Sequence, residues 1–173
     1  MKPIVLIGMM GSGKTTIGKR LAKELNLPWI DTDSYIEEKE QQRISTLFET
    51  KGESYFRSCE RDALFQLIHH PGILSTGGGI IIQEKNRECL KQNAYVIFLK
   101  TEILTLVERL THAKDRPLLQ DGAIEDKLKT LYQARQSLYE SCAHLIIQTD
   151  HLTESDIIQQ IKQHLLNQTK TSR

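Results

Sequence analysis

The clearest chemical signal in this sequence is a glycine-rich loop near its N-terminus. Residues 8–15 read GMMGSGKT and satisfy the phosphate-loop pattern GxxxxGK[ST]. Its three glycines allow successive backbone N–H groups to point into one concavity, at the positive end of the helix that follows. Lys14 adds a mobile charge for β- and γ-phosphates, and the Thr15 hydroxyl can ligate Mg²⁺. The loop therefore predicts a site for a nucleoside triphosphate.

Two carboxylates follow a second apolar segment. Asp31 and Asp33 come directly after Trp29 and Ile30, which could form a short buried strand. In parallel sheets the carboxyl ends of the strands face the ligand crevice. One carboxylate could serve the Mg²⁺ shell, while the other orients and deprotonates an acceptor hydroxyl. The same pair could equally cap a helix over residues 34–40, so the pattern alone leaves both interpretations open.

Three further features could contact the acceptor of a phosphoryl group. A run of three glycines, 77–79, follows the short apolar segment 73–75, where backbone N–H groups could approach a ligand or simply form a tight turn. Arg57 and Glu60 lie one helical turn apart and could interact. Arg135 lies in a later predicted helix. Composition alone does not separate Arg57 or Arg135 from ordinary solvated arginines.

The elements that must position these residues alternate along the chain. Short apolar runs predict parallel strands, and apolar residues at a period of 3.6 predict amphipathic helices between them. The strands are expected at 4–7, 29–30, 73–75, 95–99 and 145–148, and the helices at 15–25, 54–69, 104–110, 126–139 and 155–166. This alternation predicts an α/β fold, a three-layer sandwich around a parallel sheet.

Three segments do not fit simple strand–helix alternation. The long, mostly helical excursion 33–72 is interpreted as a substrate-binding insert. The polar segment 112–123, which contains Arg116, has the length and composition of a functional loop and is interpreted as a lid. The polar end, 167–173, is expected to be frayed.

Composition limits the class of protein. The chain has 173 residues, 39% of them hydrophobic, and 23 Lys and Arg stand against 22 Asp and Glu, which suits one folded domain. A net charge of +1 argues against general nucleic-acid binding. No stretch reaches the ~18 apolar residues of a membrane span. The three widely spaced cysteines fit reduced thiols, and the N-terminus is unlike a signal peptide, so we expect a cytoplasmic protein. The sequence shows no large exposed apolar stripe, so a monomer is the default expectation.

Taken together, the motifs resemble those of the shikimate kinases, a family of nucleoside-monophosphate-kinase-like P-loop proteins. The resemblance runs from Ile4 to about Leu165, with the segments in the family's order. They are GMMGSGKTTIGKRLA, DTD, GESYFRSCE, STGGG, the RPLL of the expected lid, and YQAR at 132–135. The resemblance implies a five-stranded parallel sheet in the order 2-3-1-4-5. It also implies phosphorylation of the 3-hydroxyl of shikimate by ATP and Mg²⁺, a step of aromatic amino-acid biosynthesis.

The resemblance also implies roles for individual residues near the nucleotide. Thr15 would bind Mg²⁺ with Asp31 in its outer shell, and Arg116 of the lid would close onto the phosphates. The phosphates of ATP would be held by Gly11, Ser12, Gly13, Lys14, Thr15 and Thr16.

On the acceptor side, Asp33 would hydrogen-bond the shikimate hydroxyls and act as base for the 3-OH. The clamp for the shikimate carboxylate would be Arg57, Arg135 and the backbone of Gly78, with Gly79 close to the substrate and Glu60 positioning Arg57. Lys14 and Arg116 would neutralise the charge that develops on the transferred group.

Two departures and two rival functions accompany this interpretation. Segment 73–76 lacks the Walker-B aspartate of general P-loop enzymes, and the resemblance implies that Asp31 takes a related role. The loop 149–153 lacks the arginine and proline that many members place near adenine, where Arg109 is a candidate for stacking.

Another small-molecule kinase, for gluconate or a nucleotide, is the first rival function. A GTP-dependent switch is the second, although the sequence holds neither DxxG nor NKxD.

Overall fold

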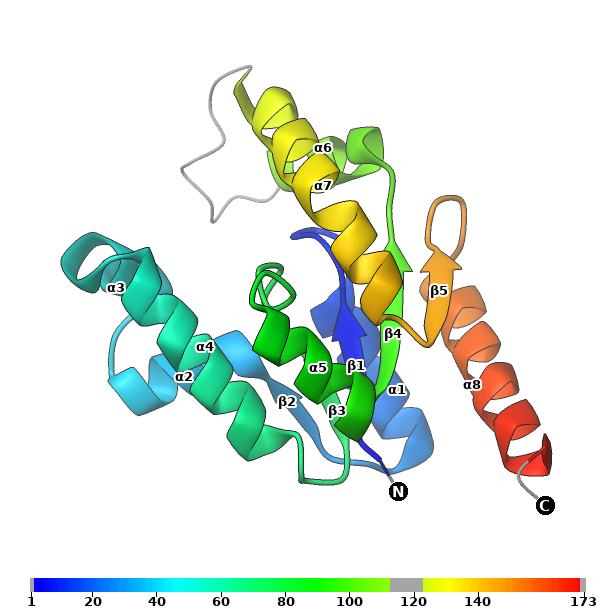
Figure 1. Cartoon of the computed structure of the whole chain (residues 1–173). Helices are drawn as coiled ribbons and strands as arrows, with labels where there is room; N and C mark the ends of the chain where they lie inside the picture. The colour runs from blue at the N-terminus through cyan, green and yellow to red at the C-terminus, as the bar shows by residue number, and fades with distance from the viewer. Residues whose placement is uncertain (1, 113–122, 172–173) are drawn as a thin grey trace.

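The computed structural model describes residues 2–112 and 123–171, which fold around one five-stranded parallel sheet (Figure 1). The strand order is β2-β3-β1-β4-β5, which confirms the implied order. Every neighbouring pair is parallel, so the carboxyl ends of the strands lie at one edge. The strands are β1 Ile4–Ile7, β2 Trp29–Asp31, β3 Ile73–Ser75, β4 Tyr95–Lys100 and β5 Leu145–Gln148.

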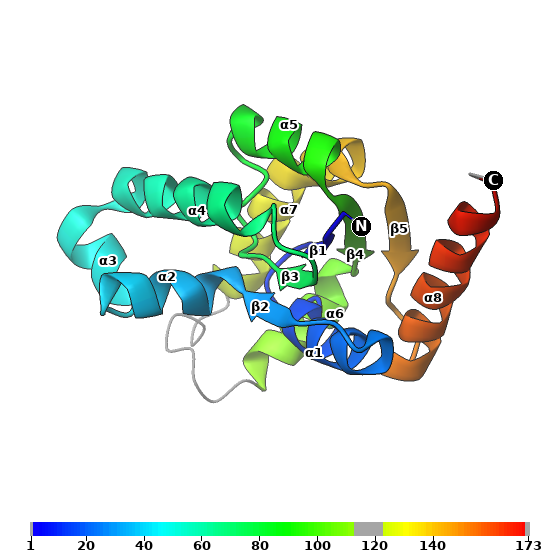
Figure 2. The ribbon, with the colours of Figure 1, turned by 90° about the horizontal axis from the view of Figure 1, so that it is seen from below.

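Helices cover both faces of this sheet, as predicted. Figure 2 shows α1 and α8 on one face, and α4, α5 and α7 on the other. The described helices are α1 Lys14–Leu25, α2 Thr32–Glu40, α3 Ile44–Lys51, α4 Glu53–Leu67, α5 Glu84–Asn93, α6 Ile103–Thr111, α7 Ala123–Cys142 and α8 Glu154–Thr171. The three-layer α/β/α prediction is therefore confirmed.

The alternation of side chains along the central strand builds the two cores. In β1, Ile4 and Leu6 pack with the α1 and α8 side, while Val5 and Ile7 pack with the opposite layer. All four are at most 4% exposed. A strand buried on both faces must be apolar at every position, which is why this segment is a continuous apolar run.

The segment between β2 and β3 forms three helices, α2 to α4, with a small core of their own. Ile36, Leu47, Phe56 and Ala63 pack together there. In Figure 1 these helices extend sideways from the sheet, and α3 lies farthest from it. This separate core fixes α4, the helix that carries Arg57 and Glu60.

Two helices differ from the expectation. α5 was not predicted, because Leu90 is its single large apolar residue and its second buried residue is Asn86. α8 continues past Leu166, where we expected a frayed end, to Thr171. Its polar residues are compatible with a helix, and Gln168 Nε2 donates to the Tyr95 hydroxyl at 3.4 Å. No helix among the described residues combines the length and apolarity that crossing a bilayer requires.

Candidate functional site

The glycine-rich loop joins β1 to α1 at the carboxyl edge of the sheet. Gly11 and Gly13 have φ angles of 81° and 94°, which a residue with a Cβ adopts only with strain. The N-terminus of α1 therefore opens toward the loop, with Gly13 as its N-cap. Lys14 Nζ donates to the carbonyls of Gly8 and Met9 at 2.9 Å each, so the lysine lies across the loop. Backbone donors, helix dipole and ammonium group together form an anion site.

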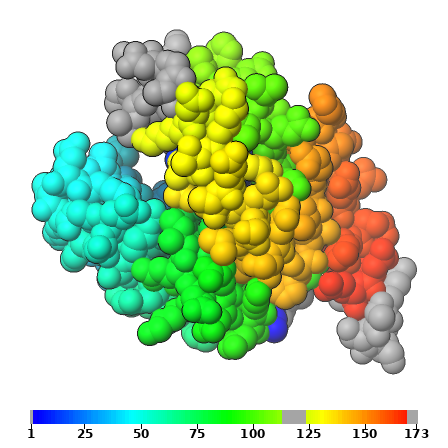
Figure 3. All heavy atoms as spheres, turned by 45° about the horizontal axis from the view of Figure 1, so that its top comes forward, coloured from blue at the N-terminus to red at the C-terminus, as the bar shows by residue number. Residues whose placement is uncertain are grey.

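A cavity of about 680 Å³ extends from this loop. Asp31, Asp33, Thr76 and Gly78 line it together with residues 10–17. The ends of β1, β2 and β3 thus meet, as the parallel topology requires. The space-filling view shows a hollow between the insert, in cyan, and α7, in yellow (Figure 3).

Asp31 caps a helix and also contacts the threonine of the phosphate loop. Its Oδ1 accepts from the backbone N–H groups of Asp33 and Ser34 at 3.1 and 3.2 Å, so it caps α2. Its Oδ2 accepts from the Thr15 hydroxyl at 2.9 Å. This hydroxyl and carboxylate, side by side on the cavity wall, are oxygen donors of the kind that Mg²⁺ takes. The described residues contain no group of three or more His, Cys, Asp or Glu that could hold a metal ion.

Asp33 lies beside the glycine turn and the buried Glu60. A Cβ on Gly77 would stand 2.7 Å from Asp33 Oδ1 and 3.0 Å from Glu60 Oε1. A glycine at 77 is therefore needed for the two carboxylates to approach the turn. Gly77 N–H itself donates to the Thr32 hydroxyl at 3.3 Å, which ties the turn to the start of α2.

Arg57 and Glu60 form a mostly buried ion pair on α4. Arg57 Nη1 donates to Glu60 Oε2 at 2.8 Å, and its Nη2 donates to Glu53 at 3.2 Å. Glu60 is 1% exposed, and its Oε1 has no hydrogen-bond partner among the described residues. Burial raises the pKa of Glu60 to about 7, although the charge of Arg57 acts in the opposite direction. A Cβ on Gly79 would overlap the Arg57 guanidinium, so the arginine lies directly against the glycine turn.

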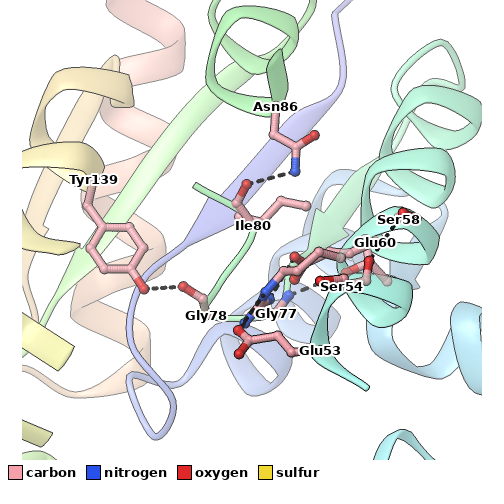
Figure 4. A network of polar contacts seen from close by, with 11 residues as sticks. Glu53, Ser54, Ser58, Glu60, Gly77, Gly78, Ile80, Asn86 and Tyr139 are labelled. Atoms are coloured by element: carbon pink, nitrogen blue, oxygen red, sulfur yellow. Dashed lines mark hydrogen bonds and ion pairs between the residues drawn. The ribbon is translucent and has the colours of Figure 1, made fainter. Parts of the chain in front are cut away.

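Helix α7 approaches the same turn from the other side. Tyr139 donates to the Gly78 carbonyl, and Asn86 of α5 donates to the Ile80 carbonyl at 2.9 Å (Figure 4). Arg135, one turn before Tyr139, lies close enough for its charge to lower the pKa of Tyr139 and that of Glu60, against the effect of burial. The two candidate arginines, far apart in sequence, therefore flank one turn.

The far end of the cavity has a different lining. Arg109 lines it, and its Nη1 donates to the Gly11 carbonyl at 3.0 Å. Leu152, Glu154 and Ile157 add a partly apolar wall that the sequence did not indicate. Arg116 and nearly all of the predicted lid lie outside the described residues.

Tyr139 was also missed from the sequence. Its position four residues after Arg135 on an amphipathic helix was the one available signal, because residues at that spacing share a face.

The sheet order and the loop at its carboxyl edge define this protein as a P-loop kinase by fold. A sequence model described as shikimate kinase matches residues 10–166. The chain belongs to the shikimate kinase family, and so to the transferases that use ATP as co-substrate.

Individual relatives agree with this assignment. The chain is 42% identical over 159 residues to a shikimate kinase of Xylella fastidiosa strain M23, covering 91% of this chain and 88% of the relative. A solved shikimate kinase from Acinetobacter baumannii, in complex with shikimate, has a TM-score of 0.90 and 40% identity, covering 97% of this chain and 94% of that one. A gluconokinase from Sinorhizobium meliloti, at 15% identity and a TM-score of 0.59, covers 96% of each chain and shares the fold alone.

Proposed function

We propose that this protein transfers the γ-phosphoryl group of ATP to the 3-hydroxyl of shikimate, giving shikimate 3-phosphate and ADP. The observation that carries the proposal is the convergence of Asp33, Arg57 and Arg135 on the glycine turn beside the phosphate loop. A cavity lined by the phosphate cradle, Asp33 and Gly78, with the two guanidiniums beside the glycine turn that borders it, suits a hydroxylated carboxylic acid.

Binding of the acceptor falls to the two arginines. Their planar guanidiniums match a carboxylate in a bidentate manner, and Gly78 adds backbone groups on the cavity wall. Glu60 limits the freedom of Arg57, because one of its oxygens accepts from Nη1 at 2.8 Å. Gluconate also has a carboxylate, but its open chain would lose more conformational entropy than a ring on being held at both ends.

The chemical step follows from the position of Asp33. Its carboxylate would orient the 3-hydroxyl and accept the proton as the oxygen bonds to the γ-phosphorus, while the bond from that phosphorus to the leaving oxygen of ADP breaks. Lys14 would stabilise the charge on the phosphates, and Arg116 would add a second cation if residues 112–123 act as a lid. Positioning and charge neutralisation supply most of the catalysis in this kind of transfer.

Thr15 and Asp31 are the residues that would hold Mg²⁺, together with oxygens of the nucleotide. When bound, the ion neutralises phosphate charge and so favours the transfer. The side chains of this pair are already aligned, since the Thr15 hydroxyl donates to Asp31 at 2.9 Å.

A coupled assay of ADP production tests the proposal. With Mg²⁺ and ATP present, we expect turnover with shikimate, and none with gluconate, with a nucleoside monophosphate or without an acceptor. Calorimetry should show binding of shikimate alone among these acceptors. Turnover of gluconate or a nucleotide in place of shikimate would overturn the assignment, and acceptor-independent GTP hydrolysis would favour the switch class.

A further inference from the structure

Tyr139 is a buried residue that touches three parts of the site at once. It is 0% exposed, and its ring stacks on Phe98 of β4, with 4.9 Å between the ring centroids. Its hydroxyl donates to the Gly78 carbonyl and lies 3.7 Å from the Met9 sulfur in the phosphate loop, and the charge of Arg135 acts on it. Packing against Phe98 needs only the ring, so the hydroxyl has a separate role.

We propose that Tyr139 is a positioning residue for the acceptor: through its hydroxyl it sets the orientation of the Gly78–Gly79 peptide in the acceptor site. The proposal rests on the function proposed above. A trans peptide is planar, so the N–H of Gly79 points opposite to the carbonyl of Gly78. Holding that carbonyl toward α7 turns the Gly79 N–H toward the other side, where the Arg57 guanidinium lies against Gly79. The Gly79 N–H and Arg57 then present donors to one carboxylate.

The turn is closed by its own backbone, because Ile80 N–H donates to the Gly77 carbonyl at 3.2 Å and Ile82 N–H donates to the Gly79 carbonyl at 3.0 Å. Neither bond uses the Gly78 carbonyl or the Gly79 N–H, so the orientation of the peptide between them needs a separate constraint. Three consecutive glycines have wide conformational freedom, and a peptide between two of them can rotate easily. Asn86 fixes the following residue by donating to the Ile80 carbonyl at 2.9 Å, and Gly77 is fixed by Thr32 at 3.3 Å. The peptide between these two anchors is held by Tyr139 (Figure 4).

The phenol is suited to this task at every physiological pH. Burial raises the pKa of Tyr139 to about 12, so the hydroxyl keeps its proton and always donates. The charge of Arg135 acts on the same phenol in the direction that lowers its pKa, which favours donation to the Gly78 carbonyl. Tyr139 thus lies next to both an arginine of the predicted carboxylate clamp and the glycine turn.

Tyr139→Phe tests this inference, since it removes one oxygen and keeps the ring on Phe98. The KM for shikimate should rise ~10-fold, which corresponds to ~1.4 kcal/mol, within the range for one buried hydrogen bond. kcat should change less than ~2-fold and the KM for ATP should stay unchanged, because the contact is made equally in the ground state and the transition state. An unchanged KM for shikimate would overturn the inference, as would a rise confined to the KM for ATP.

Two controls separate positioning from packing. Phe98→Leu removes the ring stack but leaves the hydroxyl, and should lower the melting temperature with little change in either KM. Tyr95→Phe alters a tyrosine at the amino end of β4, opposite the site, and should leave all kinetic constants unchanged. If Phe98→Leu raises the KM for shikimate as much as Tyr139→Phe does, packing explains the effect and the inference fails.

A second variant covers the case in which Tyr139→Phe does not fold. 4-Fluorophenylalanine introduced at position 139 fills the space of the hydroxyl but cannot donate a hydrogen bond, and it should reproduce the same rise in KM. The wild-type protein is assayed first. If it does not phosphorylate shikimate, the proposed function fails; if it does and neither variant alters the KM for shikimate, only the role of Tyr139 fails.

Discussion

Glu60→Gln is expected to stabilise the fold and weaken the acceptor site at the same time. The side chain is 1% exposed, one oxygen accepts from Arg57 at 2.8 Å, and the other has no partner among the described residues. Burial raises its pKa from an ordinary value of 4.5 to about 7, against the opposing effect of Arg57. Below a pH of about 7 the folded protein therefore favours the neutral acid even with the arginine beside it, and above that pH the carboxylate pairs with Arg57.

The sign of the pH dependence follows from proton binding. Between about 4.5 and 7 the folded state holds the Glu60 proton and the unfolded chain releases it, so the stability due to this group falls as the pH rises through that window. At ~1.4 kcal/mol for each pH unit, the free energy of unfolding falls by ~3 kcal/mol across this window. Glutamine resembles the neutral acid, so the variant should match the wild type near pH 4.5. At pH 8 its free energy of unfolding should be higher by up to ~3 kcal/mol.

Urea unfolding at both pH values measures this difference. The fluorescence of Trp29 provides the signal, because it is the single tryptophan and its indole N–H donates to Ser75 at 3.0 Å within the sheet. The KM for shikimate should rise, since an amide holds the Arg57 guanidinium less firmly than a carboxylate does. Glu53→Gln is the matched control: it contacts the same arginine but is 63% exposed, so the pH profile of stability should not change. A Glu60→Gln variant less stable than wild type at pH 8 would refute the reasoning and show that the ion pair outweighs the burial.

Three further substitutions test the other parts of the site. Arg57→Ala should raise the KM for shikimate ~10- to 100-fold by removing charged hydrogen bonds, with ATP affinity retained in calorimetry; near-normal shikimate binding would contradict its place in the clamp. Asp33→Asn should lower kcat ~10²- to 10⁴-fold while ATP still binds, and a rate within a few-fold of wild type would exclude the base role. Gly79→Ala should displace the Arg57 guanidinium and so imitate Arg57→Ala in a kinetic assay. Gly78→Ala is the matched control for stability, because its added Cβ would meet nothing closer than 3.5 Å. Equal shikimate kinetics in Gly79→Ala and the wild type would argue against the contact between Gly79 and Arg57.

Local patterns in the sequence were enough for the phosphate loop and the sheet. The loop is a contiguous motif whose glycines and lysine each have a local reason, so Lys14 lies where the pattern requires. The five strands appear as short apolar runs because a parallel strand is buried on both faces. Asp31 and Asp33 could be placed at the ligand edge from topology alone, since strands of a parallel sheet end at the same edge.

Helix α5 shows where the sequence pattern fails. Its ten residues include only one large apolar side chain, and Asn86 occupies a buried position where a hydrophobic residue would be expected. The asparagine is buried because its Nδ2 donates to the carbonyl of Ile80, a bond that forms only after the glycine turn has folded against the helix. Amphipathic periodicity cannot detect a helix whose buried face is partly polar.

The sequence by itself determined the nucleotide side of this protein, because its chemistry lies in consecutive residues that depend on their neighbours in the chain. The acceptor side was decided by tertiary structure. Arg57 and Arg135 look like ordinary surface arginines until α4 and α7 bring them to the same glycine turn. The contact of Tyr139 with Gly78 joins residues 61 positions apart, and the pairing of Glu60 with Arg57 follows from helical spacing while the burial of Glu60 does not. Burial and such long-range contacts exist only once the sheet and its two helical layers have packed, and they set the charge and the orientation of the groups at the site.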